Sequence, residues 1–140
     1  VYELTPRRSA VLVDQTLYWY WLDSQEAADY YVGLFNSGPL ADRINVFIPE
    51  GVFGRRHLHT VPWQVAPVFD PANASHRQVA ALSGSLRVQV AEFIKNCPDL
   101  EDSGKWLKTG RRLIRDWLES NSDMQALNKD AAKVLKTKAS

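Results

Sequence analysis

Proline is concentrated in one part of this 140-residue chain, where four of the seven prolines lie between residues 49 and 71. They are Pro49, Pro62, Pro67 and Pro71, with Gly51 and Gly54 among them. Because proline fixes φ and has no backbone N–H, it is excluded from helix interiors and from central strands. We therefore expect residues 49–74 to be irregular and extended, with at most short strands, and docked on the protein by their apolar side chains.

The segment before this stretch predicts a strand followed by two helices. Residues 9–22 (SAVLVDQTLYWYWL) are rich in β-branched and aromatic side chains. The same parity is shared by Val11, Val13, Leu17, Trp19 and Trp21, which favours a strand. Ser24 is a suitable N-cap for a helix whose inner face would hold Ala27, Ala28, Tyr31, Leu34 and Phe35. The Asn36-Ser37-Gly38 sequence would end this helix, and Pro39 would start a shorter one over residues 39–48.

The segment after this stretch predicts three helices. Ser75 and Gln78 form a capping-box pattern at the start of a helix that would run to Cys97, just before Pro98. Its apolar stripe consists of Val79, Leu82, Leu86, Val90, Phe93, Ile94 and Cys97. A second helix would begin near Trp106 and a third near Asp123. The expected fold class is therefore α+β, with a short β-sheet covered by helices and followed by a C-terminal helical hairpin.

The sequence lacks the motifs of several enzyme classes. Its seven glycines form neither GxGxxG nor GxxxxGK[ST], and no GxSxG nucleophile elbow is present. His57 and His59 would project to the same side of an extended segment, with His76 as a third candidate zinc ligand. Because the neighbouring arginines would repel a cation, we predict no metal site. Because the motifs named above are missing, we also predict no catalytic residue and no cofactor in this chain.

The net charge of +1 is unevenly distributed along the chain. Residues 1–104 carry 8 basic and 12 acidic side chains, a net charge of −4, whereas residues 105–140 carry 9 basic and 4 acidic ones, a net charge of +5. One helical face would hold Lys105, Lys108, Arg112 and Arg115, with Arg111 beside it. Such a face is either solvated charge or a contact for the phosphates of a nucleic acid.

A second group of donors lies in the segment FGRRHLHTVPW, namely Arg55, Arg56, His57 and His59. All four side chains can donate hydrogen bonds to phosphates or to base edges, and Trp63 offers a stacking surface nearby. The alternative is structural: the arginines would pair with internal carboxylates while the histidines bond to backbone carbonyls. These residues by themselves favour neither role.

Composition bears on the compartment of the protein. Its one cysteine, Cys97, allows no internal disulfide, which suits a reducing cytoplasm, and we expect a buried and inert thiol. No stretch approaches the roughly 20 apolar residues of a membrane span, and the first residues lack the zones of a signal peptide. Because the sequence does not start with Met, we expect it to be part of a longer chain.

Four motifs in order carry a resemblance to a known family. They are Asp14-Gln15-Thr16-Leu17-Tyr18, Leu34-Phe35-Asn36-Ser37, the run from Phe53 to Pro62 (FGRRHLHTVP), and the run from Phe69 to His76 (FDPANASH). Together they span about residues 11 to 95. This succession resembles the C-terminal end of large bacterial adenine-specific DNA methyltransferases, including restriction–modification enzymes that carry methyltransferase and target-recognition modules in one chain.

The resemblance implies a role in DNA binding without catalysis. Residues 1–100 would be the C-terminal part of a target-recognition module, and residues 101–140 a basic helical tail. The NPP[YF] loop and the glycine motif for S-adenosylmethionine are missing from this sequence, so an upstream methyltransferase domain of the same chain would supply both. Double-stranded DNA would contact Arg55, Arg56, His57 and His59, with the Lys105–Arg115 face as a second contact.

Two other functions are compatible with the sequence. The helices after Ser75 could pack against the rest of a larger enzyme or a partner subunit, as a protein-interaction module without DNA contact. A metal-dependent hydrolase would use His57, His59 and His76 and would contain bound zinc.

Overall fold

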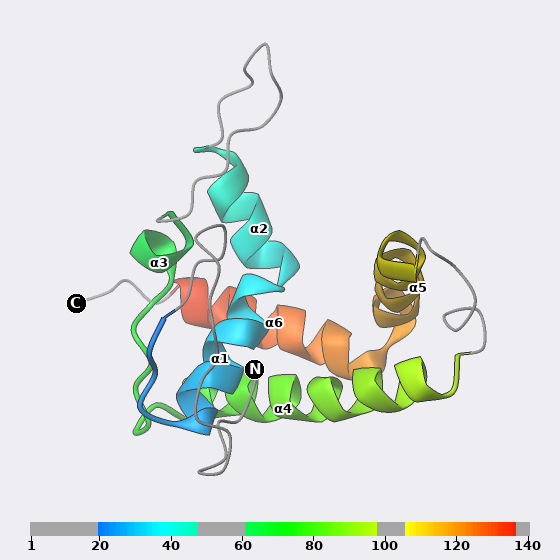
Figure 1. Cartoon of the computed structure of the whole chain (residues 1–140). Coiled ribbons are helices and arrows are strands. Elements are labelled where there is room, and N and C mark those ends of the chain that lie inside the picture. Colours follow the sequence, from blue (N-terminus) through cyan, green and yellow to red (C-terminus); the bar gives the residue numbers. More distant parts are fainter. Residues whose placement is uncertain (1–19, 48–60, 98–105, 137–140) are drawn as a thin grey trace.

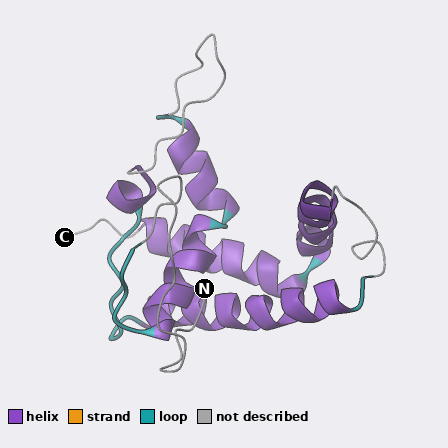
Figure 2. Ribbon diagram, in the orientation of Figure 1, coloured by secondary structure: helices purple, strands orange, loops and turns teal. Residues whose placement is uncertain are grey.

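The computed structural model describes residues 20–47, 61–97 and 106–136 of the chain. Within these ranges the chain forms six helices (Figure 1) and no strand (Figure 2). The expected α+β class is therefore wrong, because the described residues are helical and contain no sheet. Most of the strand expected over residues 9–22 lies outside the described ranges, and residues 20–22 are irregular.

The aromatic residues that favoured a strand have a different role in the described part of the chain. The ring of Tyr20 stacks on the ring of Trp63, with a centroid distance of 4.0 Å. The neighbouring Trp21 is 76% exposed. Aromatic side chains are enriched in strands because they pack well on a pleated surface, but helices offer them an equally apolar surface. For residues 20–22, residue type alone therefore predicted the wrong element.

The first two helices follow the sequence-based prediction closely. Helix α1 (Gln25–Phe35) begins after Ser24, whose hydroxyl accepts a hydrogen bond from the backbone N–H of Ala27 at 3.1 Å. Helix α2 (Gly38–Asn45) begins after Ser37, with Pro39 in its first turn. The Asn36-Ser37-Gly38 boundary is thus confirmed, and it joins the two helices directly.

Helix α3 (Val61–Val65) lies in the stretch that was expected to be irregular. Pro62 is its second residue, and N–H groups in the first turn have no hydrogen-bond partner within the helix, so proline is tolerated there. The ring of Trp63 lies edge-on to Phe35, with a centroid distance of 4.7 Å, so this short helix is docked on α1. The prediction of extended backbone was wrong here because tertiary packing of an aromatic anchor stabilises a helical turn.

Helix α4 (Ala74–Lys95) is the longest element, but it begins earlier than the capping-box pattern indicated. Its N-cap is Asn73, whose side-chain oxygen accepts from the N–H of Ser75 at 2.9 Å. Asp70 shapes the preceding turn, because its carboxylate accepts from the N–H of Ala72 and its carbonyl from the N–H of Asn73. Ser75 therefore lies inside the first turn, and its assignment as N-cap was wrong.

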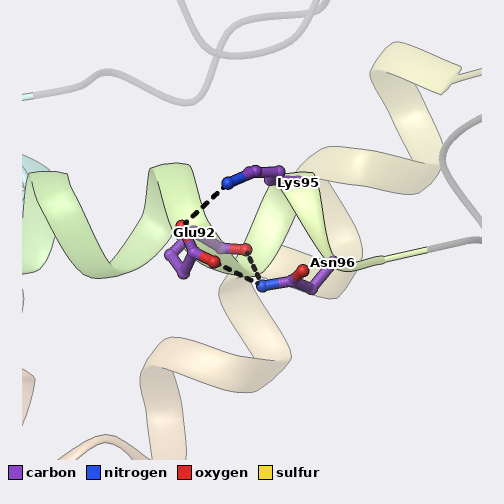
Figure 3. Close-up of polar contacts among 3 residues, drawn as sticks. All are labelled: Glu92, Lys95 and Asn96. Atoms are coloured by element: carbon purple, nitrogen blue, oxygen red, sulfur yellow. Dashed lines mark hydrogen bonds and ion pairs between the residues drawn. The ribbon is translucent and has the colours of Figure 1, made fainter.

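The other end of α4 confirms the expected stop before Pro98. The side-chain amide of Asn96 donates to the carboxylate of Glu92 at 2.7 Å and to the Glu92 carbonyl at 3.0 Å (Figure 3). Lys95 lies 3.8 Å from the same carboxylate, which places a cation near the negative end of the helix dipole. Cys97 follows and is half-buried.

Helices α1 and α6 (Ser122–Lys136) both pack along α4, and α2 packs on α6 (Figure 1). Residues from all four helices form one core, namely Tyr30, Leu34, Leu40, Val79, Ala80, Ala131, Val134 and Leu135, together with Ala66. The C-terminal segment therefore supplies part of the central core. The proposed functional division at residue 100 stays a prediction, but α6 is an integral part of the fold.

Close approach of α1 and α4 depends on small residues. A Cβ added to Gly33 would lie 2.8 Å from the Cβ of Ser83. Beside this crossing, Asp29 is buried, and its Oδ1 lies 3.3 Å from the Nε of Arg87. The pair is a charge contact rather than an aligned hydrogen bond, since Oδ1 has no hydrogen-bond donor among the described residues.

Candidate nucleic-acid interface

Helix α5 (Trp106–Ser120) carries the described part of the cationic surface that the sequence predicts. Its main packing partners among the described helices are α4, near the C-terminal end of that helix, and α6, and Figure 1 shows it at one end of the molecule, away from α1, α2 and α3. A helix at the edge of the fold presents much of its circumference to solvent.

One side of α5 packs on the body of the protein. The ring of Trp117 stacks on Phe93 of α4, with a centroid distance of 5.2 Å and an angle of 23° between the planes. At 3.6 residues per turn, Leu113 and Gly110 lie on the same side as Trp117. Gly110 is buried and Leu113 half-buried, as expected for an inner face. This contact determines which side of α5 faces outward.

The opposite side of α5 is cationic over its first two described turns. Its exposed basic side chains are Lys108, Arg111, Arg112 and Arg115. Helical periodicity places all four on the side away from Trp117. None of them forms an ion pair within the described ranges, although the exposed carboxylates of Asp116 and Glu119 follow in the last turn. We call these four residues the α5 cationic face.

This surface has the properties of an anion-binding site. Like charges three and four residues apart on a helix repel one another, so a bound anion that neutralises them lowers the free energy of the folded protein. Arginine presents several N–H donors in a planar fork that matches the oxygens of a phosphate. A row of such donors on an exposed helix can therefore bind successive phosphates of a nucleic-acid backbone without contacting bases.

The other predicted DNA contacts lie outside the described residues. Arg55, Arg56, His57 and His59 belong to the range 48–60, and Lys105 to the range 98–105. The structure therefore does not test their roles. It does describe Trp63, whose ring stacks on Tyr20 and lies edge-on to Phe35, so that Tyr20 already occupies one of its faces.

His76, the third candidate zinc ligand, is a buried structural residue. Its Nδ1 accepts a hydrogen bond from the N–H of Asp70 at 3.0 Å, and its ring lies 4.9 Å from that of Tyr30. Burial lowers the pKa of His76, and the nearby charge of Asp70 only partly opposes this. Among the residues described, no group of three or more His, Cys, Asp or Glu side chains could hold a metal ion.

Sequence reasoning missed a polar network at the junction of α5 and α6. It joins Ser85 and Gln89 of α4 to Asn121 and Asp123. The pattern Asn-Ser-Asp before an amphipathic run is a typical helix start, and the helix predicted to begin near Asp123 agrees with the start of α6 at Ser122. Nothing local in the sequence indicates that Gln89, more than thirty residues earlier, would join this network.

Across the helices that the structure describes, none is long and apolar enough to cross a membrane. No family model, curated protein or solved structure matches this chain.

Proposed function

We propose that this chain binds double-stranded DNA through its phosphates, as a non-catalytic part of a bacterial adenine-specific DNA methyltransferase of the restriction–modification type. The observation that carries the proposal is the α5 cationic face, where four basic side chains are exposed and unpaired within the described ranges. The four motifs within residues 11–95 support the choice of family.

Further parts of the proposal depend on the sequence alone. Arg55, Arg56, His57 and His59 would form a second contact with DNA. The parent enzyme would use S-adenosylmethionine, bound by an upstream domain of the same chain, and would act in the cytoplasm. This chain would then supply binding energy and register on the duplex but no reacting group, since phosphate contacts position a protein without reading sequence.

The length of the cationic face indicates how many phosphates it can reach. Lys108 and Arg115 are seven residues apart, which corresponds to about 10 Å along a helix. Each strand of a duplex carries one charge per about 3.4 Å of helix axis, so the face spans about three phosphates. Three neutralised phosphates predict a slope of about −3 in a plot of log affinity against log salt concentration. Affinity should therefore fall roughly 50-fold between 50 and 200 mM salt.

The direct test is duplex binding by the double variant Lys108→Ala/Arg112→Ala, measured by fluorescence anisotropy across this salt range. The variant should bind more weakly at every salt concentration and show a smaller salt slope, with an unchanged melting temperature, because both side chains are exposed. The variant Lys129→Ala/Lys136→Ala is the control, since it removes the same charge from exposed positions on α6. It should retain most of the affinity and of the slope.

A parallel variant, Arg55→Ala/Arg56→Ala, tests the second contact in the same assay. Wild-type binding that does not change with salt would contradict the proposal, as would equal affinity of the α5 variant and its control. If the wild-type chain does not bind duplex DNA and the arginine variants instead lower the melting temperature, the chain is better explained as a module that packs against other protein.

A further inference from the structure

Helices α5 and α6 are joined by a single residue, Asn121, whose side chain makes contacts on both sides. Its oxygen accepts hydrogen bonds from the backbone N–H groups of Asp123 at 2.9 Å and of Met124 at 3.2 Å, and so caps the first turn of α6. Its amide nitrogen donates to the side-chain oxygen of Gln89 at 2.9 Å. The link between the two helices is therefore attached directly to α4.

The side-chain nitrogen of Gln89 also forms hydrogen bonds at this junction. Its Nε2 donates to the carboxylate of Asp123 at 2.6 Å and to the hydroxyl of Ser85 at 2.9 Å. The Ser85 hydroxyl in turn donates to Asp123 at 3.0 Å. A side chain at position 89 must accept from Asn121 and donate to Asp123 at once, and an amide of this length satisfies both requirements.

The direction of α5 depends strongly on this junction. The ring of Trp117 in α5 stacks on Phe93 of α4, which holds one side of the helix inward but acts at a single position along it. Among the described helices, α5 packs mainly on α4 and α6, and the chain turns between α5 and α6 within one residue. The hydrogen bonds of Gln89 hold that turn in one geometry.

We infer that Gln89 is a positioning residue, which fixes the direction of α5 relative to α4 and thereby orients the α5 cationic face. Gln89 itself would not contact the phosphates. The consequence for DNA depends on the proposed function, because a row of cations matches successive phosphates only when the helix that carries them has a defined direction. The effect on helix direction does not depend on DNA.

The sharpest variant is Gln89→Glu, which keeps the shape of the side chain. It replaces both Nε2 donors with an oxygen and sets a second carboxylate beside Asp123. The hydrogen bond between positions 89 and 123 should therefore be lost, and the two side chains should move apart. The double variant Gln89→Glu/Asp123→Asn should rescue it, because the new amide at position 123 can donate to the new carboxylate at position 89. The double variant also restores the wild-type net charge.

The first measurement is the distance between spin labels on α4 and α5. Labels at Ala81→Cys and Lys108→Cys, in a Cys97→Ser background, report the position of the N-terminal part of α5 relative to an exposed site on α4. We expect one narrow distance distribution in the otherwise wild-type protein, a broadened or displaced one in Gln89→Glu, and a narrow one again in the double variant. Far-UV circular dichroism of each variant should show unchanged helix content.

The second measurement is duplex affinity of the same variants without labels. Gln89→Glu should bind at least threefold more weakly than Gln125→Glu, which adds the same charge at an exposed position of α6, and the double variant should recover. An unchanged distance distribution in Gln89→Glu overturns the positioning role. Changed distances with affinity equal to that of Gln125→Glu overturn the link to DNA. If the wild type does not bind DNA at all, the proposed function fails, and the label distances alone decide the role of Gln89.

Discussion

His76 shows how one buried polar side chain can make the stability of this protein depend on pH. The side chain is 6% exposed, and its Nδ1 accepts a hydrogen bond, so the folded protein requires the neutral imidazole. A proton on Nδ1 would remove the acceptor for the Asp70 N–H and would place a charge against the ring of Tyr30. The folded state therefore binds this proton more weakly than the unfolded chain does.

We expect acid to destabilise the protein through His76. Because burial lowers its pKa below the usual 6.5, the unfolded chain takes up the proton first as the pH falls. Stability contributed by the neutral ring is complete above about pH 6.5 and decreases below it, by at most about 1.4 kcal/mol per pH unit. Thermal unfolding at pH 7.5 and 5.5 measures the effect, with His76→Phe as the comparison, because phenylalanine packs similarly and has no proton to gain. An equal pH dependence in both proteins would exclude this role of His76.

The crossing of α1 and α4 leads to a second prediction for a single residue. Gly33→Ala should lower the free energy of unfolding by about 1–3 kcal/mol, because the new methyl group would lie 2.8 Å from Ser83 and force the helices apart. The matched control is Gly38→Ala, whose nearest neighbour would be the side-chain oxygen of Asn128 at 3.8 Å, an ordinary contact. Its effect should stay within about 0.5 kcal/mol. Urea unfolding of both variants checks the difference, and equal effects would show that the crossing can relax.

At the scale of the helices, side-chain caps determine where elements begin. Ser24, Ser37 and Asn73 each accept a hydrogen bond from an N–H in the first turn of α1, α2 and α4. Such caps satisfy donors that have no partner within the helix. The N-cap of α4 also shows the limit of local patterns, since Asn73 and Ser75 both have suitable side chains. The turn made by Asp70 decides between them, because it holds Asn73 in an extended conformation.

A pair of variants tests the assigned start of α4. Asn73→Ala should destabilise the protein by about 1 kcal/mol, the usual cost of losing an N-cap. Ser75→Ala should change stability by less than about 0.5 kcal/mol, because Ser75 already lies inside the helix, where alanine has a favourable helix propensity. Chemical denaturation gives both values. If Ser75→Ala were the more destabilising of the two, Ser75 would be the N-cap of α4.

At the scale of the whole molecule, the C-terminal segment contributes both charge and core. The same 36 residues that carry the excess of positive charge, 105–140, also supply Leu127, Ala131, Val134 and Leu135 as buried side chains. The α5 cationic face is thus attached to a helix that the core requires. Loss of α6 would remove the support of the candidate interface as well as part of the core.

Leu127→Ala should therefore be strongly destabilising, by about 2–5 kcal/mol, because it leaves a cavity at a site that is only 1% exposed. Val88→Ala removes apolar atoms from α4 at a position that is 63% exposed and should cost less than about 0.5 kcal/mol. Calorimetric unfolding of both proteins makes the comparison. Similar small effects would mean that α6 is only loosely attached to the core.

Much of the helical organisation could be predicted from local pattern. The boundary at Asn36-Ser37-Gly38, the end of α4 before Pro98 and the outward side of α5 follow from caps, breakers and the helical period. Two expected inner positions were assigned less well. Tyr30 is fully buried although the period favoured Tyr31, and Ile94 is 43% exposed although it belongs to the expected stripe. Because the apolar face of a helix is wide, packing against the neighbouring helices decides which of its residues are buried most deeply.

What the sequence determined by itself is the set of helices with strong start and stop signals, and the side of α5 on which positive charge gathers, because these depend on residues within a few positions of one another. Tertiary structure alone decided that α3 forms in a proline-rich stretch, that Tyr20, in irregular chain, stacks on Trp63 of α3, and that Gln89 meets Asn121 and Asp123. Those outcomes depend on contacts between residues far apart in the chain, where the free energy of packing and of buried hydrogen bonds exceeds the small local preferences of each residue.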